Sequence, residues 1–192
     1  MTTIMQPFKS EVDFQSGIFS PQRTLLQRYL SQMKHMYADQ DAVDKILAKE
    51  GDRLIYEVYG TEIPEEEGHI PHCTTIIYPG HIGDEYHMTK GHYHARRDQG
   101  EVYLGTAGQG YLIMQTEEGH TSELAMVTGT AAYVPPYWAH RTVNTGNEPF
   151  IFFAAWAGEA GHDYGTIEQV GFRKLLVQHD GHPAIIDNPK YP

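Results

Sequence analysis

Three residues in the stretch GHYHARRDQGEVY (residues 91–103) could bind one metal ion. His92 and His94 are two positions apart, so in an extended chain both side chains point to the same face. Glu101 follows the turn ARRDQG and opens the next predicted strand, which allows its carboxylate to lie beside the two imidazoles. His140, in the stretch YVPPYWAHRTVN, is the fourth candidate ligand.

Three imidazoles and one carboxylate form a mixed nitrogen and oxygen site, which suits a divalent first-row metal ion. Ligand type alone does not choose among Fe, Mn, Co, Ni and Zn, and the set leaves one or two positions for water or substrate. An isolated HxH is more often a surface pair, so the metal hypothesis depends on Glu101 and His140. The histidines without such neighbours are expected to be solvated or structural: His35, His69, His72, His81, His87, His120, His179 and His182.

The elements that must position these residues begin at Leu54. From there the chain has short segments that are rich in β-branched and aromatic residues and bounded by glycine or proline. This pattern predicts an all-β sandwich or small barrel. The predicted strands lie within residues 54–60, 73–80, 100–108, 108–119, 121–129, 130–136, 140–146 and 149–158. Residues 171–188 predict a hairpin that turns at Asp180 and Gly181.

A first helix is predicted after an extended N-terminal segment. Ser20 and Pro21 are a typical helix start, because a serine side chain can cap free amides and proline fits the first helical position. Apolar residues then recur at helical spacing, at Leu25, Leu26, Tyr29, Leu30 and Met33.

A second short helix is predicted over residues 41–50. Asp41 is its candidate cap and Gly51 its candidate stop. The chain has 192 residues, enough for one compact domain with a real core. We therefore expect a single domain in which an extended and helical segment (about 1–52) packs outside a barrel (about 53–190).

Composition indicates an ordinary globular protein, with 40% hydrophobic and 20% charged residues. No apolar run approaches the roughly 20 residues of a membrane span, so no membrane partner is expected. The start MTTIMQPFKSEVDF lacks a basic flank followed by an apolar core, so no secretory signal is expected. Cys73 is a lone cysteine and cannot form an internal disulfide, which suits a reducing, cytoplasmic location.

The formal net charge of -11 argues against nucleic acid as a partner, because an acidic surface repels phosphate backbones. It does not exclude a small phosphorylated substrate, since a local pocket can oppose the field of the whole protein.

The spacing of the candidate ligands resembles the two sequence motifs of the cupins. The matching residues are His92, His94, Glu101 and Gly108 in the first motif, and Gly129, Pro135, His140 and Asn144 in the second. Two departures stand out. Six residues separate His94 from Glu101, more than in most cupins, and Tyr137 stands where most cupins have glycine.

Both departures resemble one group, the cupin-type glucose-6-phosphate isomerases known mainly from archaea. The stretches TKGHYH, EVY, YVPPYWAHRTVN, EPFIF and AGHDYGTI carry this resemblance, as do YEVY and TTIIYPG, and it extends from about Phe8 to Asn188. It implies a cupin barrel with the helices packed outside. It also implies a homodimer with exchanged segments, and one divalent ion per subunit, with Fe(II) expected and Mn, Ni, Co or Zn able to substitute.

The implied reaction interconverts glucose 6-phosphate and fructose 6-phosphate. The metal would polarise the oxygens at C1 and C2, and Glu101 would be the base that moves a proton between these carbons. Coordination lowers the basicity of a carboxylate, so Glu101 could instead be only a ligand. Tyr103 faces the same way and could bond a sugar oxygen or Glu101, or simply fill the barrel.

For the phosphate, the TKG stretch offers a hydroxyl and an approachable amide, while Lys90 alternates outward. The resemblance assigns the pocket to Tyr56, Thr75, Thr89 and Gly91. It also places His162 and Tyr164 at the substrate, where His162 could assist ring opening. Without the resemblance, these two residues would be taken as a polar loop.

Trp156 stands where the archaeal pattern has a phosphate-pocket tyrosine, so the preference among phosphosugars is open. The mechanism is open too, because a direct hydride shift from C2 to C1 would serve as well as proton transfer. The alternative functions are a cupin Fe(II) dioxygenase, a non-catalytic sugar-binding or sensor cupin, and a mannose-6-phosphate isomerase.

Overall fold

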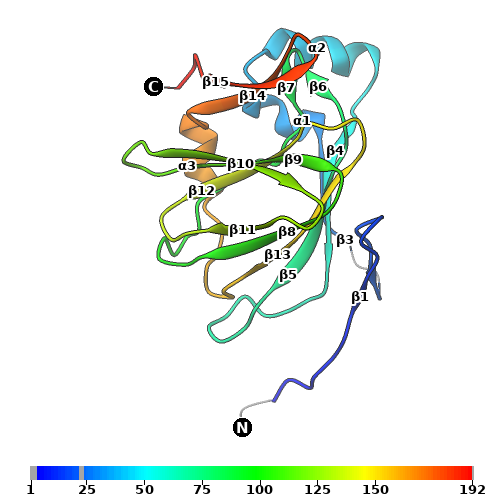
Figure 1. Cartoon of the computed structure of the whole chain (residues 1–192), viewed down its shortest axis with the longest axis vertical. Coiled ribbons are helices and arrows are strands. Elements are labelled where there is room, and N and C mark those ends of the chain that lie inside the picture. The colour runs from blue at the N-terminus through cyan, green and yellow to red at the C-terminus, as the bar shows by residue number, and fades with distance from the viewer. Residues whose placement is uncertain (1–3, 22–23, 192) are drawn as a thin grey trace.

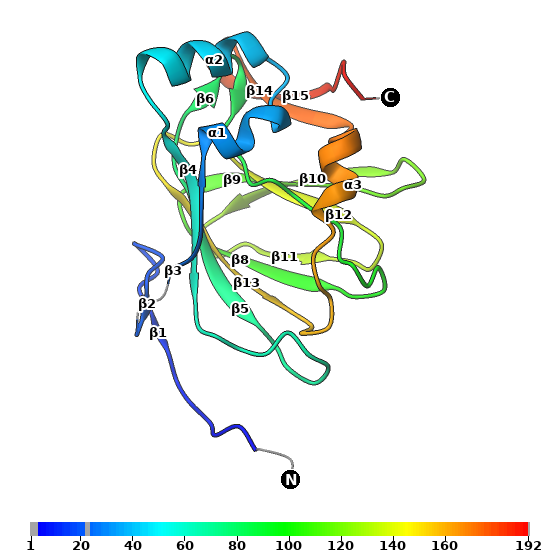
Figure 2. The same ribbon diagram turned by 180° about the vertical axis from the view of Figure 1, so that it is seen from behind.

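Two facing antiparallel sheets form most of the structure, a computed structural model that describes residues 4–21 and 24–191 (Figures 1 and 2). The prediction of a mostly β protein with few helices is confirmed. The larger sheet consists, in spatial order, of β11 (Ala131–Val134), β8 (Glu101–Ala107), β13 (Phe150–Trp156), β5 (His72–Ile77), β4 (Leu54–Gly60) and β3 (Thr24–Tyr29).

The second sheet and two smaller ones complete the strands. The sheet facing the larger one consists of β10 (Thr121–Val127), β9 (Gln109–Gln115) and β12 (Ala139–Asn144). A C-terminal sheet consists of β15 (His182–Asp187), β14 (Lys174–His179), β7 (Glu85–Tyr86) and β6 (His81–Ile82). An N-terminal arm pairs β1 (Glu11–Val12) with β2 (Phe19–Ser20).

The hairpin between β14 and β15 turns at Asp180 and Gly181, as predicted. Both residues have positive φ, 50° and 79°, which is the conformation that a two-residue turn of this hand requires. One hydrophobic core joins the sheets and the helices, with Leu30, Ile77 and Leu112 fully buried in it. Cys73 is buried and its thiol is free, which agrees with the expectation that it forms no internal disulfide.

The predicted helix after Pro21 was wrong over most of its length. Residues 22 and 23 lie outside the described residues, residues 24–29 form β3, and a helix begins only with α1 (Leu30–Met33), followed by the 3-10 helix η1 (Lys34–Met36). Strand β3 pairs with the edge of β4, which satisfies its backbone hydrogen bonds. This long-range pairing outweighs a local periodicity that would also have allowed a helix.

The second predicted helix exists as α2 (Gln40–Lys49). Its cap is Asp39 and not Asp41, because the Asp39 carboxylate accepts a hydrogen bond of 2.9 Å from the amide of Ala42. Gly51 follows the helix with a φ of 86°, so the predicted stop is correct.

A further helix, α3 (Tyr164–Val170), was not predicted. It is capped by Asp163, which accepts hydrogen bonds from the amide and hydroxyl of Thr166. Across the residues described, no helix is both long and apolar enough for a membrane span.

Candidate active site

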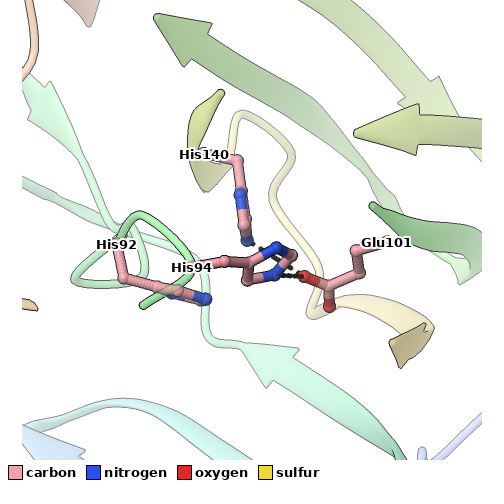
Figure 3. A group of neighbouring side chains, drawn as sticks. All are labelled: His92, His94, Glu101 and His140. Atoms are coloured by element: carbon pink, nitrogen blue, oxygen red, sulfur yellow. Dashed lines mark hydrogen bonds and ion pairs between the residues drawn. The ribbon is translucent and has the colours of Figure 1, made fainter. Parts of the chain in front are cut away.

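Four side chains converge between the two sheets in a single group. His140 comes from β12, Glu101 opens β8, and His92 and His94 come from the extended segment before it (Figure 3). One donor atom from each residue lies within 4.8 Å of all the others. The expected convergence of these four residues is therefore present in the structure.

The HxH segment is held in place by isolated bridges and not by a regular strand. His92 exchanges two backbone hydrogen bonds with His140, of 3.2 and 3.0 Å, and Tyr93 does the same with Asp163. The backbone is still extended, so both imidazoles point to the same side, as the two-residue spacing predicted.

The two departures from the general cupin motifs meet in space. Tyr137 has a φ of 72°, the left-handed conformation that glycine adopts most readily, which explains why glycine is usual there. The Tyr137 amide donates a hydrogen bond of 2.6 Å to the carbonyl of Arg97, in the lengthened turn between His94 and Glu101. The longer turn thus supplies an acceptor that stabilises the strained tyrosine.

The distances within the group fit a shared cation. Oε2 of Glu101 lies 3.2 Å from Nε2 of His94 and 3.0 Å from Nε2 of His140. Two ligand atoms at a typical distance of about 2.1 Å from a metal, and at right angles, are about 3.0 Å apart. Oε2 of Glu101 is therefore spaced from each of these two nitrogens as a neighbouring ligand of one ion would be.

The Nδ1 atoms of His94 and His140, which face away from Glu101, lie near backbone carbonyls. Nδ1 of His94 is 3.0 Å from the carbonyl of Gln99, and Nδ1 of His140 is 3.4 Å from that of Trp138. If each Nδ1 carries the proton, each Nε2 presents a lone pair to the carboxylate. Lone pairs facing a carboxylate oxygen repel it unless a cation or proton lies between them, so the residues fit a metal ion.

Burial sets the protonation states of the group. It lowers the pKa of His92 well below the usual value, and Nε2 of His92 has no hydrogen-bond partner in the described part of the chain. Burial alone would raise the pKa of Glu101, but the two imidazoles of His140 and His94 beside it outweigh burial and lower this pKa to about 2. A neutral histidine and an ionised carboxylate are the states that bind metals.

A cavity of about 330 Å³ opens onto this group. Every residue predicted for catalysis or substrate binding lines it, and so do three of the four candidate ligands, all but His94: Tyr56, Thr75, Thr89, Gly91, His92, Glu101, Tyr103, His140, Trp156, His162 and Tyr164. Strand alternation explains this, since the lining positions of each strand are two apart. Lys90 is absent from the lining and instead pairs with Glu168 of α3.

Two aromatic residues lie beside the candidate ligands. The ring of His162 is 4.6 Å from the ring of His92 and stacks on Tyr164 at 5.7 Å. Burial lowers the pKa of His162, which favours the neutral imidazole. Tyr103 is fully buried and interacts with Glu101, and its burial raises the phenol pKa well above the usual value.

Trp156 lies at the same end of the cavity. It is the cross-strand neighbour of Glu101 on β8, and its ring is 5.9 Å from that of His162. Its indole nitrogen is buried and has no hydrogen-bond partner within the described chain. Thr75 of β5 pairs with Phe152, which lies four residues before Trp156 on β13. Thr75 is therefore further along the sheet from Glu101 than Trp156 is.

Sequence reasoning missed three polar residues of the cavity, namely Arg28, Glu65 and Thr142. Arg28 is the only lysine or arginine among the described residues that line it. It pairs with Tyr56 across β3 and β4, and their side chains form a hydrogen bond. The alternation of Leu26 and Arg28 into the cavity could have revealed it, had this segment been recognised as a strand.

Solved structures give only distant similarity. An oxalate oxidase chain is 11% identical, with a TM-score of 0.43 over 51% of this chain and 47% of that chain. A Bacillus subtilis oxalate decarboxylase is 20% identical, with a TM-score of 0.41 over 53% of this chain and 26% of that chain.

Sequence comparisons are far more specific. The family model described as glucose-6-phosphate isomerase (GPI) matches residues 27–189. Proteins named glucose-6-phosphate isomerase are 46% identical in Pyrococcus horikoshii and 47% identical in Thermococcus litoralis, over 97% of this chain and of theirs. One from Sinorhizobium medicae is 33% identical over 94% of this chain and 85% of its own. The chain belongs to the cupin-type, archaeal-type glucose-6-phosphate isomerase family.

Proposed function

We propose that this chain is a metal-dependent isomerase that interconverts glucose 6-phosphate and fructose 6-phosphate on a cupin barrel. One observation carries the proposal. A single cavity joins a group of three histidines and one glutamate to a patch of hydroxyl groups with one arginine. The first end suits the C1 and C2 oxygens of a sugar, and the second suits its phosphate.

At the first end, a bound divalent ion, Fe(II) in this proposal, would polarise the carbonyl and hydroxyl oxygens of the substrate. His92, His94, Glu101 and His140 would hold it. The Glu101 carboxylate, ionised at neutral pH, takes the proton from C2 of glucose 6-phosphate and returns it to C1. Tyr103 remains a neutral phenol because its pKa is raised, so it can donate a hydrogen bond to Glu101 or to a sugar oxygen.

His162 is placed to assist ring opening. Its ring is close to the candidate ligands, and its lowered pKa leaves a neutral imidazole that can accept a proton from one sugar oxygen. Tyr164 stacks on this ring and fixes its orientation. Trp156 borders the same end and has an indole N–H free to donate to the sugar.

In this proposal the phosphate is bound by Tyr56, Thr75, Thr89, Gly91 and Arg28, all of which line the cavity. The Thr89 hydroxyl lies 3.2 Å from that of Thr142, so these two side chains form a small polar ladder. A guanidinium suits a phosphate because it offers two parallel N–H donors and a fixed positive charge.

The proposed function is tested by an isomerase assay on metal-stripped protein. Fe(II), Mn(II), Ni(II), Co(II) or Zn(II) is added back separately with fructose 6-phosphate, and a coupled dehydrogenase detects glucose 6-phosphate. Metal-dependent turnover is expected. No turnover with any metal, despite stoichiometric metal binding, would refute the proposal. Mannose 6-phosphate turnover and oxygen uptake would then test the two alternative enzymes.

Changing Arg28 to glutamine is expected to raise KM for fructose 6-phosphate by about 10- to 100-fold, with kcat changed by less than about threefold. Losing one charge-assisted contact to phosphate costs about 1.5–3 kcal/mol of binding free energy, and tenfold corresponds to about 1.4 kcal/mol. Steady-state kinetics on both sugar phosphates measure this. Arg53→Gln is the matched control, because Arg53 pairs with Glu50 and does not line the cavity. An unchanged KM would remove Arg28 from the phosphate site.

We also propose that the chain forms a homodimer. The N-terminal segment before β1 extends away from the sheets (Figure 2), and Phe8 and Phe14 are 52% and 55% accessible. Val102 and Tyr133, on neighbouring strands of the larger sheet, expose further apolar surface. Association of two copies would bury such side chains. Light scattering should give twice the mass of the chain, and a monomer at micromolar concentration would contradict the proposal.

A further inference from the structure

Arg141 is an arginine in an unusual place, fully buried and directly after the candidate ligand His140. On β12, His140 and Thr142 line the cavity, so the side chain of Arg141 between them points to the opposite face. Burying a guanidinium costs several kcal/mol unless its donors are satisfied. The contacts of Arg141 must therefore offset this cost.

The contacts of Arg141 converge on one backbone carbonyl. Its Nη2 and Nε donate hydrogen bonds of 2.7 and 3.2 Å to the carbonyl oxygen of Lys90. Its guanidinium also lies over the ring of Phe172, 4.5 Å from the centroid. Arg141 takes part in none of the ion pairs between described residues, although the buried Glu85 carboxylate attracts its charge, and both of its described hydrogen bonds go to the backbone of one turn.

That turn carries part of the phosphate end of the cavity. Lys90 lies between Thr89 and Gly91, both of which line the cavity, and His92 follows. A Cβ on Gly91, which has a φ of 75°, would lie 2.7 Å from the Phe172 ring and 3.0 Å from Cβ of Arg141. Gly91 therefore packs closely against Arg141 and the Phe172 ring.

The same turn is fixed on its other sides. The Thr89 amide donates a hydrogen bond of 2.9 Å to the carbonyl of Thr142, and the Lys90 side chain pairs with Glu168 of α3. The Lys90 backbone also contacts the Tyr56 hydroxyl, and the two bonds from Arg141 are the side-chain hydrogen bonds that the Lys90 carbonyl itself accepts.

We propose that Arg141 is a positioning residue for phosphate binding. Its guanidinium holds the Lys90 carbonyl away from the cavity, which turns the Gly91 amide, on the other side of the same peptide, toward the substrate phosphate. Without that hold, the peptide can rotate and present a carbonyl oxygen to the phosphate, which repels it. This inference rests on the proposed function for its substrate, and it concerns a residue that does not itself line the cavity.

The test compares Arg141→Met and Arg141→Lys with the wild-type protein. For Arg141→Met, we expect both the KM for fructose 6-phosphate and the Kd for inorganic phosphate to rise at least about tenfold. The kcat and the Kd for Mn(II) should change by less than about threefold. Arg141→Lys should recover part of the phosphate affinity, because an ammonium group can still donate to the Lys90 carbonyl.

Arg173→Met is the matched control, since Arg173 also stacks on an aromatic ring, that of Tyr191 at 4.4 Å, but does not contact this turn. It should leave all four quantities unchanged. If Arg141→Met fails to fold, Phe172→Leu removes the supporting ring instead and should weaken phosphate binding in the same direction.

Two results would overturn the inference. One is unchanged phosphate Kd and KM in a folded Arg141 variant. The other is a parallel loss of metal affinity and kcat with phosphate binding intact, which would assign Arg141 to holding His140. Phosphate and Mn(II) binding need no turnover, so a wild-type protein without isomerase activity would refute the proposed function and still leave this test decisive. A wild-type protein that binds neither phosphate nor sugar phosphate would refute both.

Discussion

Replacing Glu101 with glutamine is expected to lower kcat by about 10²- to 10⁴-fold, the usual contribution of a general base. The carboxylate is buried and contacts with His140 and His94 lower its pKa, so it is ionised at neutral pH, which is the form that a base requires. Glutamine keeps the shape of the side chain and one carbonyl oxygen that can still face the metal, but it cannot accept the proton.

The contacts of Glu101 separate its two proposed roles. Both candidate ligands His94 and His140 approach the same atom, Oε2. This leaves Oε1 for the substrate or Tyr103, so one oxygen can bind the ion while the other moves the proton. Coordination through Oε2 lowers the basicity of Oε1 but does not block it.

Measurement of this effect needs kcat at saturating metal, together with deuterium incorporation at C1 and C2 of the product in D2O. Wild-type protein should incorporate deuterium and Glu101→Gln should not. Glu159→Gln is a suitable control, since Glu159 pairs with Arg96 and does not line the cavity. If Glu101→Gln keeps kcat within about threefold of wild type and wild-type product carries no deuterium, a hydride shift replaces Glu101 as the route.

The candidate ligands could be predicted from sequence because their signal is local. His92 and His94 point the same way in any extended backbone, and Glu101 follows a recognisable turn. The longer strands from Leu54 onward could also be predicted, because their β-branched and aromatic segments are bounded by glycine and proline, whereas the two-residue strands β6 and β7 were missed.

Arg28 could not be found in this way because its position depends on a distant part of the chain. The segment from residue 24 to 29 is a strand only because β4 offers it an edge, and the same apolar spacing also fits a helix. Because this segment was predicted to be a helix, the alternation of a strand, which directs the Arg28 side chain into the cavity, was not considered. Arg141 was hidden for a similar reason, since its partner is a backbone carbonyl 51 residues earlier.

Helix α3 was missed because its start lies in a glycine-rich stretch that also fits a loop. The Asp163 cap stabilises its first turn, and the same carboxylate forms an ion pair of 2.6 Å with Arg97 in the lengthened turn before Glu101. The helix thus depends on a contact between two segments that are 66 residues apart in the sequence.

Replacing His140 with alanine is expected to weaken binding of the divalent ion by at least about 100-fold, more than changes to groups behind the ligands usually cause. Turnover at limiting metal should be lost. His140 is 1% exposed and contributes one of the converging donor atoms, so its replacement by alanine removes one of the four protein ligands. Metal titration of the stripped protein measures the affinity, with Mn(II) as the probe.

His87→Ala is the matched control for this prediction. His87 is also a buried histidine, with Nδ1 3.1 Å from the carbonyl of Tyr78, but it lies outside the group of candidate ligands. Its loss should lower stability without changing metal affinity. Equal loss of metal affinity in both variants would mean that general unfolding, and not ligand removal, explains the result.

The Glu101 and His140 variants should respond to excess metal in opposite ways. In His140→Ala, saturating metal should restore part of kcat, because Glu101 remains available as the base. In Glu101→Gln, excess metal should restore none of it, because the missing group is the one that moves the proton. If metal rescues both variants equally, Glu101 acts only as a ligand, and another residue of the cavity must move the proton. His162, whose ring lies 4.6 Å from that of the candidate ligand His92, is then the first residue to test.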